Sequence, residues 1–152
     1  MAHKSVQEMW DRFISEYPKF SDKKYVSWYF CNTKKCADEL AELVKANIKT
    51  ATCSLKYWYE TAGEKMPRTG EFNVITNWDG VAQCITRTLK LTEIVFRDMT
   101  EDLASREGEG DKSLAYWRRV HIKFFSDELR EKGIEFNEDM PVIFEEFEKV
   151  FE

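Results

Sequence analysis

The sequence predicts an α+β fold in which amphipathic helices flank a small, closed antiparallel sheet. Three observations support this class. Several segments repeat apolar residues at helical spacing, the segment 71–96 contains two β-rich runs joined by a turn, and no glycine-rich motif of a nucleotide-binding parallel sheet occurs. The chain has 152 residues, 43% of them hydrophobic, which suits one domain with one core. We expect a single domain over residues 1–152, with residues 1–23 as an N-terminal helical extension.

Three segments have the residue pattern of helices that bury one face. The first covers residues 6–17. The second covers residues 34–48 and ends near Asn47, a residue type that tolerates the left-handed conformation at a helix C-terminus. The third and longest covers residues 114–132 and stops at Gly133. Its expected core face consists of Trp117, Val120, Phe124 and Phe125.

Three regions have the character of β-strands. Residues 71–96 predict a hairpin, because Asp79 and Gly80 supply the turn chemistry between two β-rich runs. Residues 24–32 are rich in aromatic and β-branched side chains, which favours a strand. Residues 140–151 alternate in part and suit a final strand, so the elements are mixed in order as an α+β fold requires.

Charge and hydropathy restrict the classes of partner. The net charge is −5 and the pI is near 5.3, so general electrostatic attraction would not hold this protein on a long polyanion. A role with nucleic acid therefore needs a local pocket, which suits a single nucleoside. The N-terminus lacks the apolar run of a signal peptide and no stretch is long enough to cross a membrane, so we expect a cytoplasmic protein.

The cysteines and histidines do not predict a metal site. The four cysteines lack paired CxxC spacing, and only His3 and His121 could add to them. In a cytoplasmic chain we expect these cysteines to be reduced thiols of the core. We therefore predict no metal and no cofactor.

The segment Asn-Ile-Lys-Thr-Ala-Thr at residues 47–52 places a lysine directly after a predicted helix end. If the chain turns there, the Lys49 ammonium and the Thr52 hydroxyl could converge in one pocket, and a hydroxyl activated by a lysine is a known catalytic pair. The same spacing also arises by chance, and a lysine at a helix C-terminus is favourable for the helix dipole alone. From the residues alone both interpretations stay open.

The segment Glu-Gly-Glu-Gly-Asp at residues 107–111 concentrates acidic side chains before the longest helix. Its glycines let the backbone turn and leave the carboxylates unshielded, so the loop could direct Glu107 or Glu109 into a pocket. The alternative is an acidic approach to the helix N-terminus, with Asp111 as a cap.

Other candidates are aromatic or basic residues with an equally good structural explanation. Trp28 could stack on a base or pack in the core. His121 lies on an apolar helical face, where a hydrogen-bonded core histidine is the commoner case. The sequence has no true basic stripe; the segment that comes closest to one contains Arg118, Arg119 and Lys123.

The ordered set of motifs resembles a known family. The segment 47–52 is similar to the G-x-K-x-x-T signature of the ASCH domain, a PUA-like family, with Lys49 and Thr52 matching and Asn47 in place of the glycine. Residues 107–121 and 138–151 are similar to its bacterial single-domain branch. The resemblance covers the chain from Lys24 to the C-terminus.

The resemblance implies a PUA-like β-barrel with flanking helices and a cleft that recognises RNA or a modified nucleoside. It implies a metal-independent amidohydrolase acting on N4-acetylcytidine or a similar nucleoside, with Lys49, Thr52 and Glu107 as catalytic residues. We expect Glu109, Trp28 and Arg118 to bind the substrate. The alternatives are a PUA-like RNA-binding module and a ribonuclease that use the same cleft.

Overall fold

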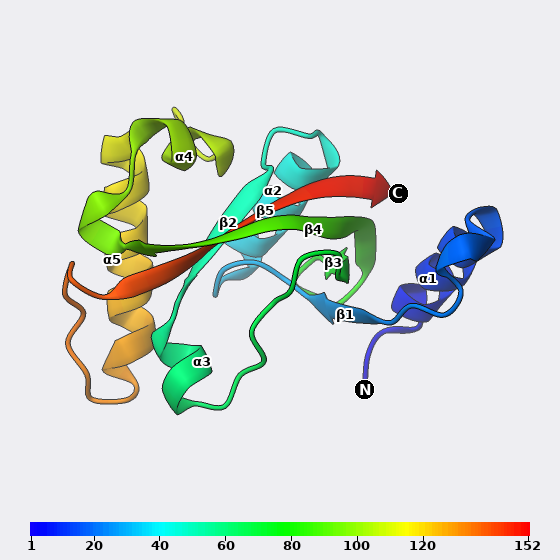
Figure 1. Ribbon diagram of the computed structural model, residues 1–152, viewed down its shortest axis with the longest axis horizontal. Helices are drawn as coiled ribbons and strands as arrows, with labels where there is room; N and C mark the ends of the chain where they lie inside the picture. Colours follow the sequence, from blue (N-terminus) through cyan, green and yellow to red (C-terminus); the bar gives the residue numbers. More distant parts are fainter.

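The computed structural model describes all 152 residues and confirms the α+β class (Figure 1). Its single sheet has five strands in the order β1-β3-β4-β5-β2. Only β1 and β3 pair in parallel; the other three pairs are antiparallel. The strands are β1 (Tyr25–Trp28), β2 (Ala51–Leu55), β3 (Phe72–Thr76), β4 (Ala82–Val95) and β5 (Pro141–Phe151).

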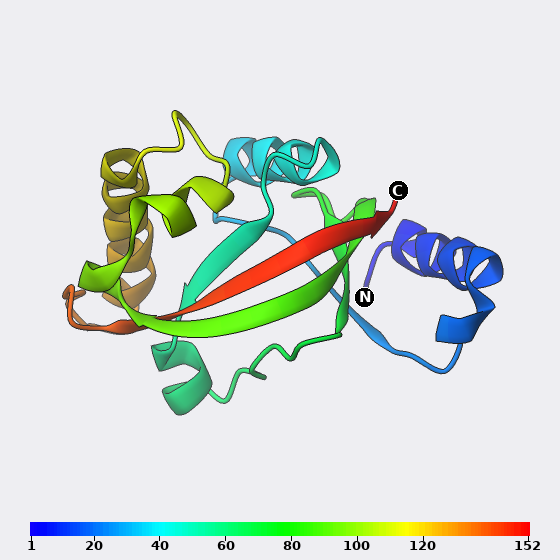
Figure 2. The same ribbon diagram turned by 45° about the horizontal axis from the view of Figure 1, so that its top comes forward.

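The predicted closure of the sheet into a barrel is wrong. The long strands β4 and β5 curve together (Figure 2), but the edge strands β1 and β2 do not pair with each other. These edge strands have only four and five residues, and both line the same cavity. In a closed barrel, hydrogen bonds would join β1 to β2. Here a cavity lined by side chains lies between these two strands instead.

Five helices and two single-turn 3₁₀ segments surround the sheet. They are α1 (Lys4–Glu16), η1 (Pro18–Phe20), α2 (Lys34–Lys45), α3 (Tyr57–Thr61), η2 (Phe96–Asp98), α4 (Glu101–Arg106) and α5 (Leu114–Arg130). Helices α1 and α5 lie at opposite ends of the molecule (Figure 1). The sequence did not predict α4, because six residues capped by Thr100 are too short to show a helical period. No helix is both long and apolar enough to cross a membrane.

The predicted helix ends and hairpin are confirmed. Asn47 adopts a left-handed φ of 61° just after α2, and Gly133 adopts a φ of 69° after α5. Strands β3 and β4 form the antiparallel hairpin, with Gly80 at a φ of 83° in its turn.

The core face of α5 differs from the prediction. Trp117, His121, Phe125 and Leu129 are the buried residues, and they recur at every fourth position. Val120 and Phe124 were predicted as core, but they are only half-buried and line the cavity. The helix is therefore rotated so that one apolar edge faces the cavity.

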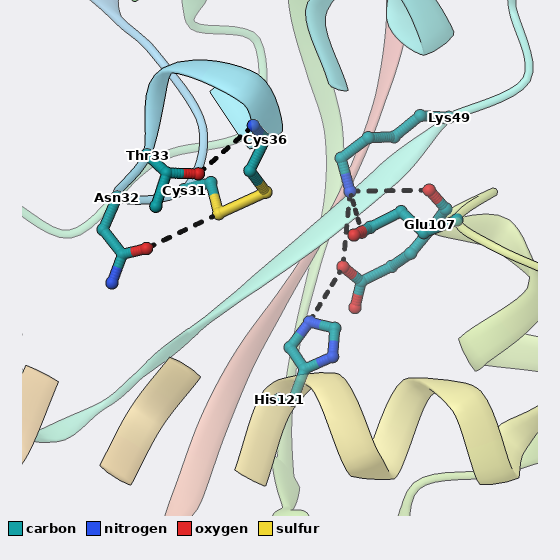
Figure 3. Close-up of a disulfide and its surroundings, with 8 residues drawn as sticks. Cys31, Asn32, Thr33, Cys36, Lys49, Glu107 and His121 are labelled. Carbon is teal, nitrogen blue, oxygen red and sulfur yellow. Dashed lines mark hydrogen bonds and ion pairs between the residues drawn. A yellow bond between two sulfur atoms is a disulfide. The ribbon is translucent and has the colours of Figure 1, made fainter. Parts of the chain in front are cut away.

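The expectation that all cysteines are reduced is also wrong. A disulfide joins Cys31 and Cys36 (Figure 3), whereas Cys53 and Cys84 are free and buried. Cys31 follows β1 with a φ of 69° and Cys36 lies in the first turn of α2, so the tight connection brings their Cα atoms within 5.9 Å. No CxxC spacing in the sequence points to this bond.

Candidate functional site

A cavity of about 690 Å³ lies between the edge strands and α5. It is bounded by residues of β1, β2, α5 and the loop after α4. Six of the candidate side chains considered from the sequence line it: those of Trp28, Lys49, Thr52, Glu107, Glu109 and His121. The structure thus gathers residues that are far apart in the chain around one space.

Lys49 lies at the centre of a buried ion cluster. Its side chain is 1% exposed. Its Nζ atom donates to Glu109 Oε2 at 2.9 Å, to Glu107 Oε1 at 3.4 Å and to the Glu107 carbonyl oxygen at 3.5 Å. Figure 3 shows Lys49, Glu107 and His121 pointing toward one another.

Backbone contacts explain why Lys49 meets the acidic loop. The left-handed turn at Asn47 redirects the chain after α2, and the Lys49 amide donates to the Leu43 carbonyl at 3.1 Å. The next residue, Thr50, donates from both its amide and its hydroxyl to the Arg106 carbonyl, at 2.9 and 3.2 Å. The segment before β2 is therefore tied to the C-terminal end of α4, where the acidic loop begins.

His121 is a member of the cluster rather than a passive core residue. Its Nδ1 atom lies 2.8 Å from the Trp117 carbonyl oxygen, and its Nε2 atom lies 3.3 Å from Glu107 Oε1. The Trp117 carbonyl can only accept, so Nδ1 donates, and the Glu107 carboxylate beside Nε2 favours the imidazolium form of His121. The Trp117 indole donates to the other oxygen of Glu107 at 2.6 Å.

The pKa directions follow from this arrangement. Burial alone would lower the pKa of Lys49 and of His121, but the neighbouring carboxylates reverse this and raise both. Burial alone would raise the pKa of Glu107, but the charges of His121 and Lys49 and the hydrogen bonds from His121 and Trp117 hold it well below its usual range. Two buried cations thus balance the carboxylates of Glu107 and Glu109.

Cys53 completes the inner wall. Burial raises the pKa of its thiol well above the usual range, and Glu107 raises it further, so Cys53 is a neutral thiol. The ligand atoms of Cys53, Glu107 and His121 lie within 4.8 Å of one another, so a cysteine and a histidine do reach the site. Glu107 and His121 already use these atoms for contacts within the protein, and Lys49 adds a positive charge beside them, so the geometry does not favour a divalent cation here.

Thr52 presents an unengaged hydroxyl to the cavity. It lies in the middle of β2, half-buried, and its register partner on β5 is Glu145. Residues opposite each other in a sheet project from the same face, so both side chains face the same space. The Thr52 hydroxyl makes no hydrogen bond to another residue, Lys49 included, and no buried polar atom of the chain lacks a partner, so this hydroxyl is accessible.

Of the remaining candidates, Trp28 lines the cavity, whereas Arg118 and Asp111 do not. Trp28 lines the cavity from β1, with its indole donating to Asn73 Oδ1 at 3.0 Å. Arg118 does not line the cavity; its guanidinium pairs with Glu138 and lies over the Phe96 ring. Asp111 is exposed and accepts a hydrogen bond from the Ser113 amide beside the start of α5.

The sequence model of the ASCH domain matches residues 26–151 of this chain. The chain belongs to the ASCH domain family. This is a PUA-like fold family often linked to RNA binding. The predicted resemblance is therefore confirmed over nearly all of β1 to β5, including Lys49, Thr52 and the acidic loop.

Two solved structures resemble the chain closely. One is the crystal structure of an ASCH domain from Lactobacillus crispatus JV V101, with 38% identity, coverage of 99% of this chain and 97% of that chain, and a TM-score of 0.95. Another is the crystal structure of a protein from Enterococcus faecalis V583, with 28% identity, coverage of 97% and 89%, and a TM-score of 0.88. No curated protein matches this ASCH chain significantly.

Proposed function

We propose that this ASCH domain is an amidohydrolase that cleaves an acyl group from a modified nucleoside such as N4-acetylcytidine. The observation that supports it is that one cavity is lined both by Thr52, whose hydroxyl is accessible, and by a buried, charge-balanced cluster around Lys49. A free nucleophile and a fixed positive charge in one cavity are the groups that acyl transfer needs.

The reaction proceeds in two steps. Thr52 Oγ1 attacks the amide carbonyl carbon, a C–O bond forms, and the carbonyl electron pair moves to oxygen. The hydroxyl proton passes to a carboxylate of the cavity and from there to the leaving nitrogen as the C–N bond breaks. Water then attacks the acyl-threonine ester, which releases the carboxylic acid and restores Thr52.

Lys49 stabilises the oxyanion as an ammonium. Its pKa is raised by Glu109 and Glu107 against the effect of burial, which does not suit a neutral lysine base. Its two contacts to Glu107, at 3.4 and 3.5 Å, are long. A proton of Nζ can therefore turn toward a stronger acceptor when negative charge develops on the substrate.

The two glutamates have different roles in this scheme. Both carboxylate oxygens of Glu107 are engaged, by Lys49, His121 and Trp117, and its lowered pKa opposes proton uptake. Glu107 therefore positions Lys49. Glu109 uses only Oε2 for Lys49, and its other oxygen has no partner within the chain, so Glu109 is the better proton acceptor.

The charge of the cavity supports a small neutral substrate over an RNA chain. Seven glutamates and three lysines line it, so phosphate groups would be repelled. Aromatic residues of the wall, Trp28, Tyr29, Trp58 and Tyr59 among them, provide faces on which a base can stack.

The test is incubation of the protein with N4-acetylcytidine and a panel of acylated nucleosides, followed by chromatography for the free nucleoside and acid. We expect release of cytidine and acetate, and mass spectrometry of a rapidly quenched reaction should show an acetyl group on Thr52. No hydrolysis of any acylated nucleoside, combined with binding of single-stranded RNA in this cavity, would replace the enzyme with a binding module.

A further inference from the structure

A second polar network, separate from the ion cluster, includes three residues that line the cavity, Trp28, Asn73 and Glu145. Trp28 Nε1 donates to Asn73 Oδ1 at 3.0 Å, Asn73 Nδ2 donates to Thr88 Oγ1 at 3.3 Å, and Thr88 Oγ1 donates to Glu145 Oε2 at 2.6 Å. Asn73, Thr88 and Glu145 are 4%, 1% and 7% exposed. Groups so well buried are kept in a fold only with defined partners.

The direction of every hydrogen bond in this network is fixed. An indole nitrogen can only donate, so the oxygen of the Asn73 amide must face Trp28. The Asn73 NH₂ group must then donate to Thr88, which leaves the Thr88 hydroxyl proton for Glu145. Glu145 Oε2 is consequently an acceptor held in place by its neighbours.

The other oxygen of Glu145 has no partner in the protein. Glu145 lines the cavity, and Oε2 is the only one of its oxygens that receives a hydrogen bond. No buried side-chain polar atom lacks a partner, so Oε1 reaches the open space. It lies beside Thr52, because Thr52 and Glu145 are register partners on β2 and β5.

We propose that Glu145 Oε1 accepts a hydrogen bond from an N–H group of the ligand and thereby selects nucleobases with a donor at this edge, such as the exocyclic amine of cytosine, over those with a carbonyl oxygen there. This inference rests on the proposed nucleoside site and names its specificity residue. Thr88 is a positioning residue, because it holds the carboxylate without contacting the ligand.

The replacement Glu145→Gln gives a sharp test because it reverses the polarity of the exposed atom. The Thr88 hydroxyl has a proton to donate, so the glutamine oxygen takes the place of Oε2 and the glutamine NH₂ group faces the cavity. A carbonyl at the ligand edge then gains a donor, while an amine loses its acceptor.

The experiment measures the dissociation constants of cytidine and uridine by titration calorimetry at slightly alkaline pH, because burial raises the pKa of Glu145 and a higher pH favours the carboxylate. These nucleosides differ at position 4 of the base, amine against carbonyl. Wild-type protein should bind cytidine at least about tenfold more tightly than uridine, and Glu145→Gln should bring the ratio to one or below. Equal ratios in the two proteins would overturn the proposal.

Two further variants complete the test. Glu148→Gln removes the same charge from an exposed position on β5 outside the cavity and should leave the ratio unchanged. Thr88→Val keeps the shape but removes the orienting hydroxyl, and it should lower the ratio without inverting it. If Glu145→Gln does not fold, an unchanged ratio in Thr88→Val overturns the proposal.

The outcome is separable from that of the proposed function, because neither probe is hydrolysed. Selective binding of cytidine without hydrolysis of N4-acetylcytidine would retain the role of Glu145 and reject the enzyme. Hydrolysis with no change of base preference in Glu145→Gln would retain the enzyme and reject the role of Glu145.

Discussion

Gly108 packs directly against Ile48, so closely that a Cβ atom on Gly108 would lie 2.3 Å from the Ile48 carbonyl oxygen and 3.0 Å from the Lys49 Cα atom. Only a residue without a side chain allows this approach. The contact places Glu107 and Glu109 on either side of Lys49. The ion cluster thus depends on a backbone contact as much as on the charges.

The first prediction concerns this contact. Gly108→Ala should displace the acidic loop and lower the free energy of unfolding by more than about 2 kcal/mol, because the clash is with backbone and φ is +71°. Gly63→Ala is the matched control, since Gly63 has a similar φ of +70° but open space around its Cβ position. It should cost only about 1 kcal/mol. Equal losses in urea melts would show that the loop does not need the close approach.

Lys49 should be required for stability as well as for chemistry. Lys49→Met leaves Glu107 and Glu109 without their cation and should cost about 3 to 5 kcal/mol in urea melts. The double variant Lys49→Met/Glu107→Gln should recover part of this loss. Lys65→Met, an exposed lysine at the cavity rim, should cost under about 1 kcal/mol. A loss that small for Lys49→Met would mean that the cluster is solvated.

Thr52, unlike Lys49, should be required for activity but not for stability. Its hydroxyl has no partner within the chain, so Thr52→Ala should change the unfolding free energy by less than about 1 kcal/mol. Hydrolysis of N4-acetylcytidine should nevertheless fall by about 10² or more, and Thr52→Ser should retain measurable activity. Full activity in a folded Thr52→Ala protein would remove Thr52 from the mechanism.

The sequence predicted the individual helices and strands better than it predicted whether the sheet closes into a barrel. Helical spacing, the hairpin turn at Asp79 and Gly80, and the stops at Asn47 and Gly133 are local signals, and all appear in the structure. Whether β1 meets β2 depends on contacts across the whole sheet, which local patterns do not encode.

The candidate site was predicted in part for the same reason. Lys49 and the acidic loop belong to motifs, so they could be found from the sequence. His121 and Glu145 enter the cavity through the rotation of α5 and the register of β5, and a lone histidine or an alternating strand glutamate gives no local sign of this. Arg118 lies on the same helix as the cavity-lining His121, but its guanidinium pairs with Glu138 outside the cavity, and a basic residue in the sequence gives no sign of which partner it will take.

The corrected face of α5 gives a further prediction. Phe125 is fully buried against Phe96 and Phe136, so Phe125→Ala should cost about 3 to 5 kcal/mol. Phe124 is half-buried on the cavity wall, and Phe124→Ala should cost less than half as much. Urea melts of the two variants compare them directly, and equal losses would restore the helical face that the sequence predicted, which contains both residues.

The last prediction concerns pH. Burial raises the pKa of Glu128 to about 7, assisted by Glu64 and Glu131, although the Trp58 indole donates to its carboxyl at 2.7 Å and opposes the rise. In the unfolded chain a glutamate has a pKa near about 4.3. Between these values the folded protein keeps a proton that the unfolded chain has released.

Stability from the protonated Glu128 is therefore complete below the unfolded pKa and is lost as pH rises to about 7. We expect the unfolding free energy of wild type minus that of Glu128→Gln to fall across this window and to stay constant above it. Glu148→Gln corrects for the general loss of one negative charge, because Glu148 is exposed and outside the cavity. A difference that rises with pH would mean that Glu128 is held as a carboxylate, stabilised by Trp58 more than it is destabilised by burial.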